Sequence, residues 1–140
     1  MKAPVLSALL KEKGYKLTAQ RQAILTALRH LGERASAKVI YEELCKQKPA
    51  VSLDTVYRNL RLLAEIGIVQ QILLQSGAVF ELTDDGRHHH HLVCVDCEKV
   101  VCISYCPESC VYTEQARLAG FAVLGHLFEV YGRCADCQQK

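Results

Sequence analysis

Two pairs of cysteines constrain the C-terminal half of this chain more than any other feature. Cys94 and Cys97 are separated by two residues, as are Cys134 and Cys137, and each pair follows a stretch of strand-like sequence. Two such thiolate pairs complete a tetrahedral S₄ zinc site without an open position, which makes the ion structural rather than catalytic. The alternative is two independent thioredoxin-like redox pairs, but no strand–helix–strand pattern surrounds either of them.

The cysteine content and the N-terminal sequence together indicate the cellular compartment of the protein. Seven of the eight cysteines lie between residues 94 and 137. The apolar stretch 3–10 runs straight into charged residues and is too short for a secretion signal, and no apolar run approaches the ~20 residues of a membrane span. We therefore expect a cytoplasmic protein without membrane contact, in which reduced thiols serve metal binding or redox chemistry.

Charge divides the chain into two parts. Residues 1–66 carry 12 Lys and Arg against 6 Asp and Glu, a net charge of +6, whereas residues 67–140 have a net charge of −4. A basic, cysteine-poor part followed by an acidic, cysteine-rich part predicts two domains, 1–84 and 85–140. Charge alone leaves open a single domain with a basic face.

The first domain is predicted to begin with four helices. Residues 5–13 suit a short amphipathic helix. Thr18, Ser36 and Ser52 each stand where a side-chain oxygen can cap one of the next three helices, the last of which runs to Gly67.

Apolar spacing then indicates the packing and the end of this domain. In the third helix Val39, Ile40 and Leu44 are expected to face the core. Residues 68–74 and 78–82 alternate as strands on either side of a turn. Short helices followed by a hairpin are typical of a winged helix-turn-helix, and the positive charge of this domain suits a DNA-binding face.

The fourth helix is the one that would enter the major groove of DNA. Val56, Leu60 and Leu63 share its apolar face, and polar residues share the other. A solvated surface with an incidental tyrosine is the alternative interpretation. The candidate DNA contacts, at the start of this helix or on its polar face, are Ser52, Thr55, Tyr57, Arg58 and Arg61.

Four consecutive histidines, residues 88–91, precede the first cysteine pair. Alternate side chains of a strand share a face, so His89 and His91 point one way, and His88 and His90 point the other. Two opposed imidazole pairs predict two metal sites, although solvated loop histidines are the usual alternative. The additional ligand candidates are Glu81, Cys102 and His126.

Three further cysteines, Cys102, Cys106 and Cys110, have no assigned partner in the sequence. Pro107 argues against one continuous helix through them. Buried apolar thiols, a redox set and soft metal ligands all remain open. Cys45, on an apolar helix face, is expected in the core.

The combination of these motifs resembles the ferric uptake regulator family. The resemblance covers roughly residues 10–137 and rests on Thr18-x-x-Arg21, Ser52-x-x-Thr55-Val-Tyr57-Arg58-x-Leu60, Phe80-Glu81-Leu82, HHHHLVCVDC and YGRCADC. It implies an α+β protein with an N-terminal winged helix-turn-helix and a C-terminal α/β dimerisation domain. It also implies a homodimeric, metal-responsive transcriptional repressor of pseudo-palindromic double-stranded DNA operators.

By position, the resemblance implies four sets of residues. The structural zinc ligands are Cys94, Cys97, Cys134 and Cys137. The regulatory metal ligands are Glu81, His89, His91 and Cys102. An additional metal site takes His88, His90, His126 and Glu108. The DNA contacts are Lys16, which reaches the minor groove, and Tyr57 and Arg58. The further DNA-contact candidates in this chain are Arg21, Ser52, Thr55 and Arg61.

The chain departs from the family pattern at two places, Cys102 and the segment before the third helix. Cys102 stands where family members commonly have Asp or Glu, and a thiolate favours zinc over manganese or ferrous iron. The segment before the third helix lacks the histidine often found there, and Glu33 is the candidate substitute. Peroxide-sensing members tend to have Asp at the position of Glu81.

These residues predict a metal-dependent repressor of iron or zinc uptake genes. Its regulatory ion would be Fe²⁺ or Zn²⁺, with Mn²⁺ disfavoured. A peroxide- or thiol-redox-sensing regulator of the same fold is the alternative. No enzyme is expected, because the sequence has no catalytic zinc motif, Walker loop or nucleophile elbow.

Overall fold

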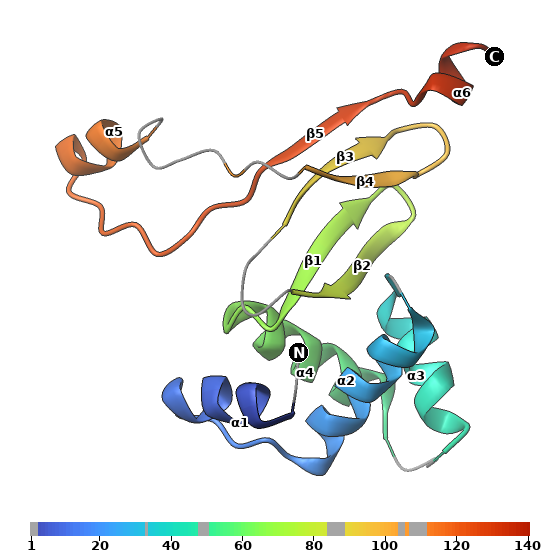
Figure 1. Ribbon diagram of the computed structural model, residues 1–140, viewed down its shortest axis with the longest axis vertical. Helices are drawn as coiled ribbons and strands as arrows, with labels where there is room; N and C mark the ends of the chain where they lie inside the picture. The colour runs from blue at the N-terminus through green and yellow to red at the C-terminus, as the bar shows by residue number, and fades with distance from the viewer. Residues whose placement is uncertain (1–2, 33, 48–50, 84–88, 104–105, 107–111) are drawn as a thin grey trace. The chain divides into compact units, whose positions relative to one another are not determined.

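The chain forms two compact units, Met1–His88 and His89–Lys140. Figure 1 shows the elements of both. The computed structural model describes residues 3–32, 34–47, 51–83, 89–103, 106 and 112–140, with side chains described from residue 6 onward. The predicted boundary between residues 84 and 85 lies outside these residues. None of the helices within the described ranges has both the length and the apolar character to cross a membrane.

The N-terminal unit consists of four helices followed by a hairpin, as predicted. Its elements are α1 (Ala3–Glu12), α2 (Ala19–Leu31), α3 (Ala37–Cys45), α4 (Leu53–Glu65), β1 (Val69–Leu74) and β2 (Gly77–Leu82). The two strands pair antiparallel from Val69↔Leu82 to Leu74↔Gly77. A β-bridge between Ala35 and Phe80 ties the segment before α3 to the hairpin.

The three predicted helix caps are confirmed. Thr18 Oγ1 accepts a hydrogen bond from the Arg21 backbone N–H at 3.2 Å. Ser36 Oγ accepts one from Val39 N–H at 3.2 Å, and Ser52 Oγ accepts one from Thr55 N–H at 3.1 Å. Each bond satisfies an N–H group that has no partner within its own helix, and so fixes where the helix begins.

The core of this unit forms where the helices and the hairpin meet. Its fully buried side chains include Leu10, Ile24, Ile40, Leu60 and Ile68. The expectation for Val39 is wrong, because this side chain is 41% exposed. The buried stripe of α3 instead runs through Ala37, Ile40, Glu43 and Leu44, and Val39 lies about 100° around the helix from Ile40.

Ser36→Ala is expected to lower the free energy of unfolding of the N-terminal unit by about 1 kcal/mol, because α3 loses its cap. Urea unfolding of the full chain, followed by far-UV circular dichroism, measures the change. Ser36→Gly is the matched control and should cost only roughly a few tenths of a kcal/mol. A Ser36→Ala variant as stable as the parent would contradict the capping role.

The C-terminal unit is built around a three-stranded sheet in the order β4-β3-β5. Its elements are β3 (His90–Cys94), β4 (Val100–Ile103), α5 (Thr113–Leu118), β5 (Glu129–Gly132) and α6 (Ala135–Gln138). The central strand β3 pairs antiparallel with β4 and parallel with β5 (Figure 1). With a helical first unit and this mixed second unit, the predicted α+β class is confirmed.

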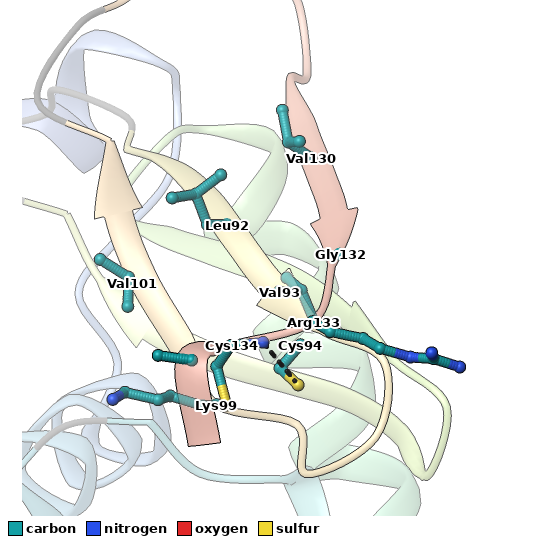
Figure 2. A pocket seen from close by; sticks show the side chains of 10 residues that line it. Leu92, Val93, Cys94, Lys99, Val101, Val130, Gly132, Arg133 and Cys134 are labelled. Carbon is teal, nitrogen blue, oxygen red and sulfur yellow. Dashed lines mark hydrogen bonds between the residues drawn. The ribbon is translucent and has the colours of Figure 1, made fainter. Parts of the chain in front are cut away.

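One face of this sheet is apolar and open. Leu92, Val101 and Val130 are each between 40% and 46% exposed, and they line a shallow pocket together with Val93 (Figure 2). Monomeric proteins rarely expose contiguous apolar patches of large size, so such a face is characteristic of a protein–protein contact.

Candidate metal centres and nucleic-acid interface

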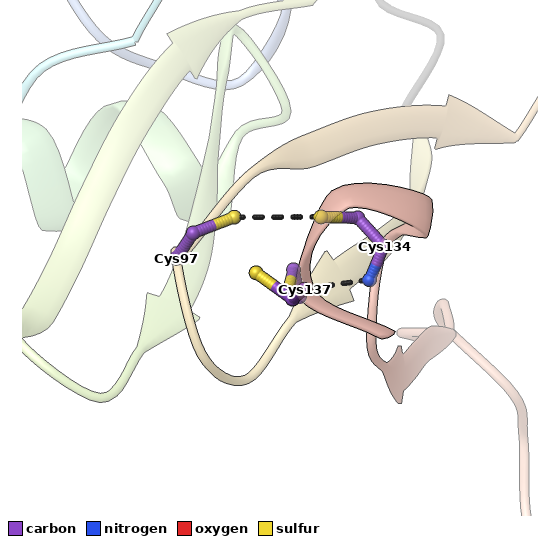
Figure 3. A group of neighbouring side chains, drawn as sticks. Cys97, Cys134 and Cys137 are labelled. Carbon is purple, nitrogen blue, oxygen red and sulfur yellow. Dashed lines mark hydrogen bonds between the residues drawn. The ribbon is translucent and has the colours of Figure 1, made fainter. Parts of the chain in front are cut away.

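The four predicted zinc ligands come together in the C-terminal unit. Cys94 ends β3, Cys97 follows in the turn, Cys134 precedes α6 and Cys137 lies within it. All four Sγ atoms lie within 4.8 Å of one another. Figure 3 shows Cys97, Cys134 and Cys137 of this group. The distance from Cys97 Sγ to Cys134 Sγ is 3.7 Å. A tetrahedron with Zn–S bonds of about 2.3 Å has edges of about 3.8 Å, so the cluster fits a structural zinc ion.

Strand pairing explains how cysteines so far apart in sequence meet. Because β3 and β5 are parallel, Cys94 stands opposite Gly132, and both strands end at the same end of the sheet. The Val95 N–H donates to the Gly132 carbonyl at 2.9 Å, and the Cys134 N–H donates to Cys94 Sγ at 3.3 Å. The second bond places the two cysteine pairs against each other.

The environments of the thiols differ within this cluster. The backbone N–H groups of Cys134 and Cys97 lower the pKa of Cys94 to about 6. A hydrogen bond with Cys134, together with burial, raises the pKa of Cys137 to about 12. Only thiolates bind zinc, so these four residues would hold the ion with Cys94 already favouring the thiolate, whereas Cys137 would have to lose a proton.

A second group of ligand atoms is formed by His89, His91 and Cys102, which lie within 4.8 Å of one another. His91 is fully buried in β3 and is paired in register with Cys102 of the neighbouring β4. Cys102 is exposed, so the buried-thiol interpretation is wrong for this residue. The remaining predicted ligand, Glu81, belongs to the N-terminal unit, where Arg34 Nε lies 2.9 Å from its Oε2. Glu33 lies outside the described residues.

A third group joins His90 and His126, as predicted, with a residue that sequence reasoning did not place there. Cys106 Sγ lies 3.1 Å from Nε2 of each histidine, and the two Nε2 atoms are 3.2 Å apart. Cys106 is exposed, so the buried-thiol interpretation is wrong here too. The other predicted members, His88 and Glu108, lie outside the described residues, as does Cys110.

The alternation of the histidines therefore separates them as expected. His89 and His91 lie in one group and His90 in another, because neighbouring residues of a strand point to opposite faces. The role of Cys106 had no comparable signal. Its proximity to His90 and His126 is a contact between residues far apart in the sequence, which no periodicity reports.

The outer face of α4 carries the predicted DNA contacts. Val56, Leu60 and Leu63 are buried on the inner face. Tyr57 is 44% exposed on the outer face, and Arg58 forms an ion pair of 3.1 Å with Asp54. The other exposed or half-exposed candidates here are Ser52, Thr55 and Arg61.

Arg21 holds the start of α2 against α4. Its Nη1 donates to the Lys16 carbonyl at 2.6 Å, its Nε donates to Asn59 Oδ1 at 3.2 Å, and its guanidinium lies over the Tyr15 ring, 5.8 Å from the centroid. These contacts within the protein position the exposed Lys16 relative to α4. A direct contact of Arg21 with DNA stays a prediction.

Comparison with known proteins agrees with these features. Residues 12–131 match the model of the Ferric uptake regulator family. The chain is 33% identical to the ferric uptake regulation protein of Synechococcus elongatus, over 99% of this chain and 96% of that protein. It is 34% identical to the peroxide-responsive repressor PerR of Staphylococcus aureus, over 95% and 89%.

A solved structure is also similar in both sequence and fold. The ferric uptake regulator from Pseudomonas aeruginosa with manganese is 31% identical, with 91% of this chain and 96% of that chain covered and a TM-score of 0.64.

Proposed function

Because the chain belongs to the ferric uptake regulator family, whose members include metal-responsive regulators, we propose that it is a metal-dependent transcriptional repressor. It binds a pseudo-palindromic operator in double-stranded DNA as a homodimer and controls genes for iron or zinc uptake. It acts in the cytoplasm and is a regulator rather than an enzyme.

The grouping of His89, His91 and Cys102 is the observation that carries this proposal. His91 lies in β3, His89 comes directly before this strand, and Cys102 lies in the neighbouring β4. Their ligand atoms lie within 4.8 Å of one another, a spacing suited to one ion. We assign these residues, with Glu81, to the regulatory metal. A ligand from each unit would let the ion restrict the motion of one unit against the other. DNA affinity would then rise with the fraction of molecules in the binding-competent arrangement.

The DNA-binding part of the proposal rests on α4. In a winged helix-turn-helix this helix lies in the major groove. Tyr57 and Arg58 are exposed there for contact with bases or phosphates, and Ser52 and Thr55 stand at the helix N-terminus, which favours phosphate. Lys16 is assigned to the minor groove.

Arg58→Ala is expected to weaken operator binding by roughly tenfold to a hundredfold, the effect of losing an arginine that reads a base edge. Fluorescence anisotropy with a duplex selected by the protein from a random library measures the affinity. Asp54→Asn is the matched control, because it breaks the same ion pair but leaves the guanidinium in place. An unchanged affinity for Arg58→Ala would remove Arg58 from the interface.

The proposal of a homodimer rests on the C-terminal unit. Its sheet exposes Leu92, Val101 and Val130, and Leu118 and Phe121 are more than 70% exposed beyond it. A second copy of the chain that buried these side chains would remove them from water, which is the usual driving force of homodimer formation.

The regulatory ion is proposed to be Fe²⁺ or Zn²⁺. The thiolate of Cys102 favours zinc relative to Mn²⁺, which prefers oxygen ligands. A peroxide- or thiol-redox-sensing function is the second candidate. It is favoured by the exposure of Cys102 and Cys106 and by the similarity to the peroxide-responsive repressor.

One experiment tests the function as a whole. Elemental analysis of gently purified protein identifies the bound metals, and titration with Zn²⁺ or Fe²⁺ is followed by anisotropy of the selected duplex. We expect sequence-specific DNA binding only when the protein holds further metal in addition to one structural zinc per chain. Binding that is independent of added metal but lost on peroxide treatment, with loss of free thiols, would favour the redox function instead.

A further metal site is proposed for His88, His90, His126 and Glu108, as the family resemblance implies. Of these residues, His90 and His126 are described, and their Nε2 atoms are 3.2 Å apart.

A further inference from the structure

His90, Cys106 and His126 converge from three separate parts of the C-terminal unit. His90 begins β3, His126 precedes β5, and Cys106 comes from the segment between β4 and α5. Their Nε2, Sγ and Nε2 atoms form a triangle with sides of 3.1, 3.1 and 3.2 Å. Three metal-binding atoms this close, from residues so distant in sequence, form a defined cluster rather than a chance pair.

The outer nitrogens of both rings have partners that orient them. His90 Nδ1 lies 3.2 Å from the Phe128 carbonyl, which only accepts, so Nδ1 carries the proton and Nε2 presents its lone pair to the cluster. His126 Nδ1 lies 3.1 Å from the Tyr112 hydroxyl. Histidines that bind metals characteristically engage the other ring nitrogen with a carbonyl or hydroxyl in this way.

We propose that Cys106 is a thiolate ligand of a metal site completed with His90 and His126, and that this N₂S site takes zinc. It is separate from the S₄ cluster and from the group containing His91. A carboxylate at Glu108, as the family resemblance implies, is not required for it.

The dimensions of the cluster agree with this ion. Zn–N bonds of about 2.0–2.1 Å and Zn–S bonds of about 2.3 Å give tetrahedral edges of about 3.3–3.6 Å. The observed sides are shorter by only about a few tenths of an ångström. Imidazole and thiolate together suit zinc, whereas Mn²⁺ prefers carboxylate and water oxygens. Cys106 therefore sets the preference of the site.

Cobalt provides a direct probe of the sulfur ligand, because Co²⁺ bound to a thiolate shows a charge-transfer band in the near ultraviolet. The full chain, with its structural zinc retained, is titrated with Co²⁺ in a Cys102→Ser background. This substitution removes the thiol of the group formed with His89 and His91, so that group cannot produce the band. We expect the band in this background and its loss when Cys106→Ser is added. His126→Ala in the same background should also abolish the band.

Cys45→Ser is the matched control in that background, because Cys45 lies in α3 of the other unit. It should leave the band unchanged. Zinc content of one per chain and an unaltered circular dichroism spectrum establish that each variant keeps its fold and its S₄ site. A band that persists with Cys106→Ser, or that is absent from the Cys102→Ser background, overturns the proposal.

A second measurement tests the choice of metal. Cys106→Asp replaces the thiolate with a carboxylate and should lower the ratio of Zn²⁺ to Mn²⁺ affinity by about tenfold or more, measured by competition with a chelating dye. An unchanged ratio would also overturn the proposal. The inference rests on the proposed metal-dependent function, but its readouts are metal affinity and spectra. Failure of metal-dependent DNA binding would therefore leave them unaffected.

Discussion

Cys137→Ser is expected to release the structural zinc and to unfold the C-terminal unit. Val93, Cys94 and Cys137 are the only buried apolar residues among those the structure describes in this unit, so two of the three belong to the zinc cluster. A unit with so small a core depends on its metal. Structural zinc supplies an apparent ~10–16 kcal/mol in small peptides, more than such a core provides.

The measurements are zinc per chain by elemental analysis, dimer content by size-exclusion chromatography, and helicity by circular dichroism. Helical signal from the N-terminal unit should persist, because that unit has its own core of leucine and isoleucine side chains. Cys45→Ser is the control and should retain zinc and dimer. A zinc-free Cys137→Ser protein that remained a folded dimer would contradict the structural role of the ion.

The second large effect is expected at the proposed regulatory site. A variant with Glu81→Ala, His89→Ala and His91→Ala should lose about a hundredfold or more in operator affinity at saturating metal, to the level of the metal-free parent. Metal shifts the protein toward the binding-competent state only because it binds this state more tightly than the other state. A variant that has lost the ligands no longer gains from added metal. The anisotropy assay with the selected duplex measures both proteins.

Two controls separate this loss from unfolding. The variant should retain at least one zinc per chain, because the S₄ cluster is untouched. Its weak affinity for unrelated duplex DNA should equal that of the parent, since this depends on the basic N-terminal unit. A variant that still bound the operator in a metal-dependent way would show that these residues are not the sensor.

Sequence reasoning succeeded where the determinants are local. Thr18, Ser36 and Ser52 cap their helices because a cap needs only a side-chain oxygen near the next N–H groups. The two strands of the hairpin and the division of the histidines between two faces follow from the period of two.

It failed where position depends on tertiary packing. Val39 is next to Ile40 in an apolar run, and only the packing of α3 decides which of them is buried. The grouping of Cys106 with His90 and His126 is a contact between residues far apart in the sequence, and no local pattern predicts it. The contacts of Arg21 with the Lys16 carbonyl and Asn59 had no local signal either, and its contact with DNA stays a prediction.

The strand β3 contributes to all three ligand clusters, through His90, His91 and Cys94. Inserting or deleting one residue within it would therefore misplace ligands of several clusters at once, which makes its length hard to alter during evolution. Cys102 and Cys106 lie outside this strand. If the two proposed sites bind metal, substitutions of these cysteines would change which cation each of the two selects and would leave β3 unchanged.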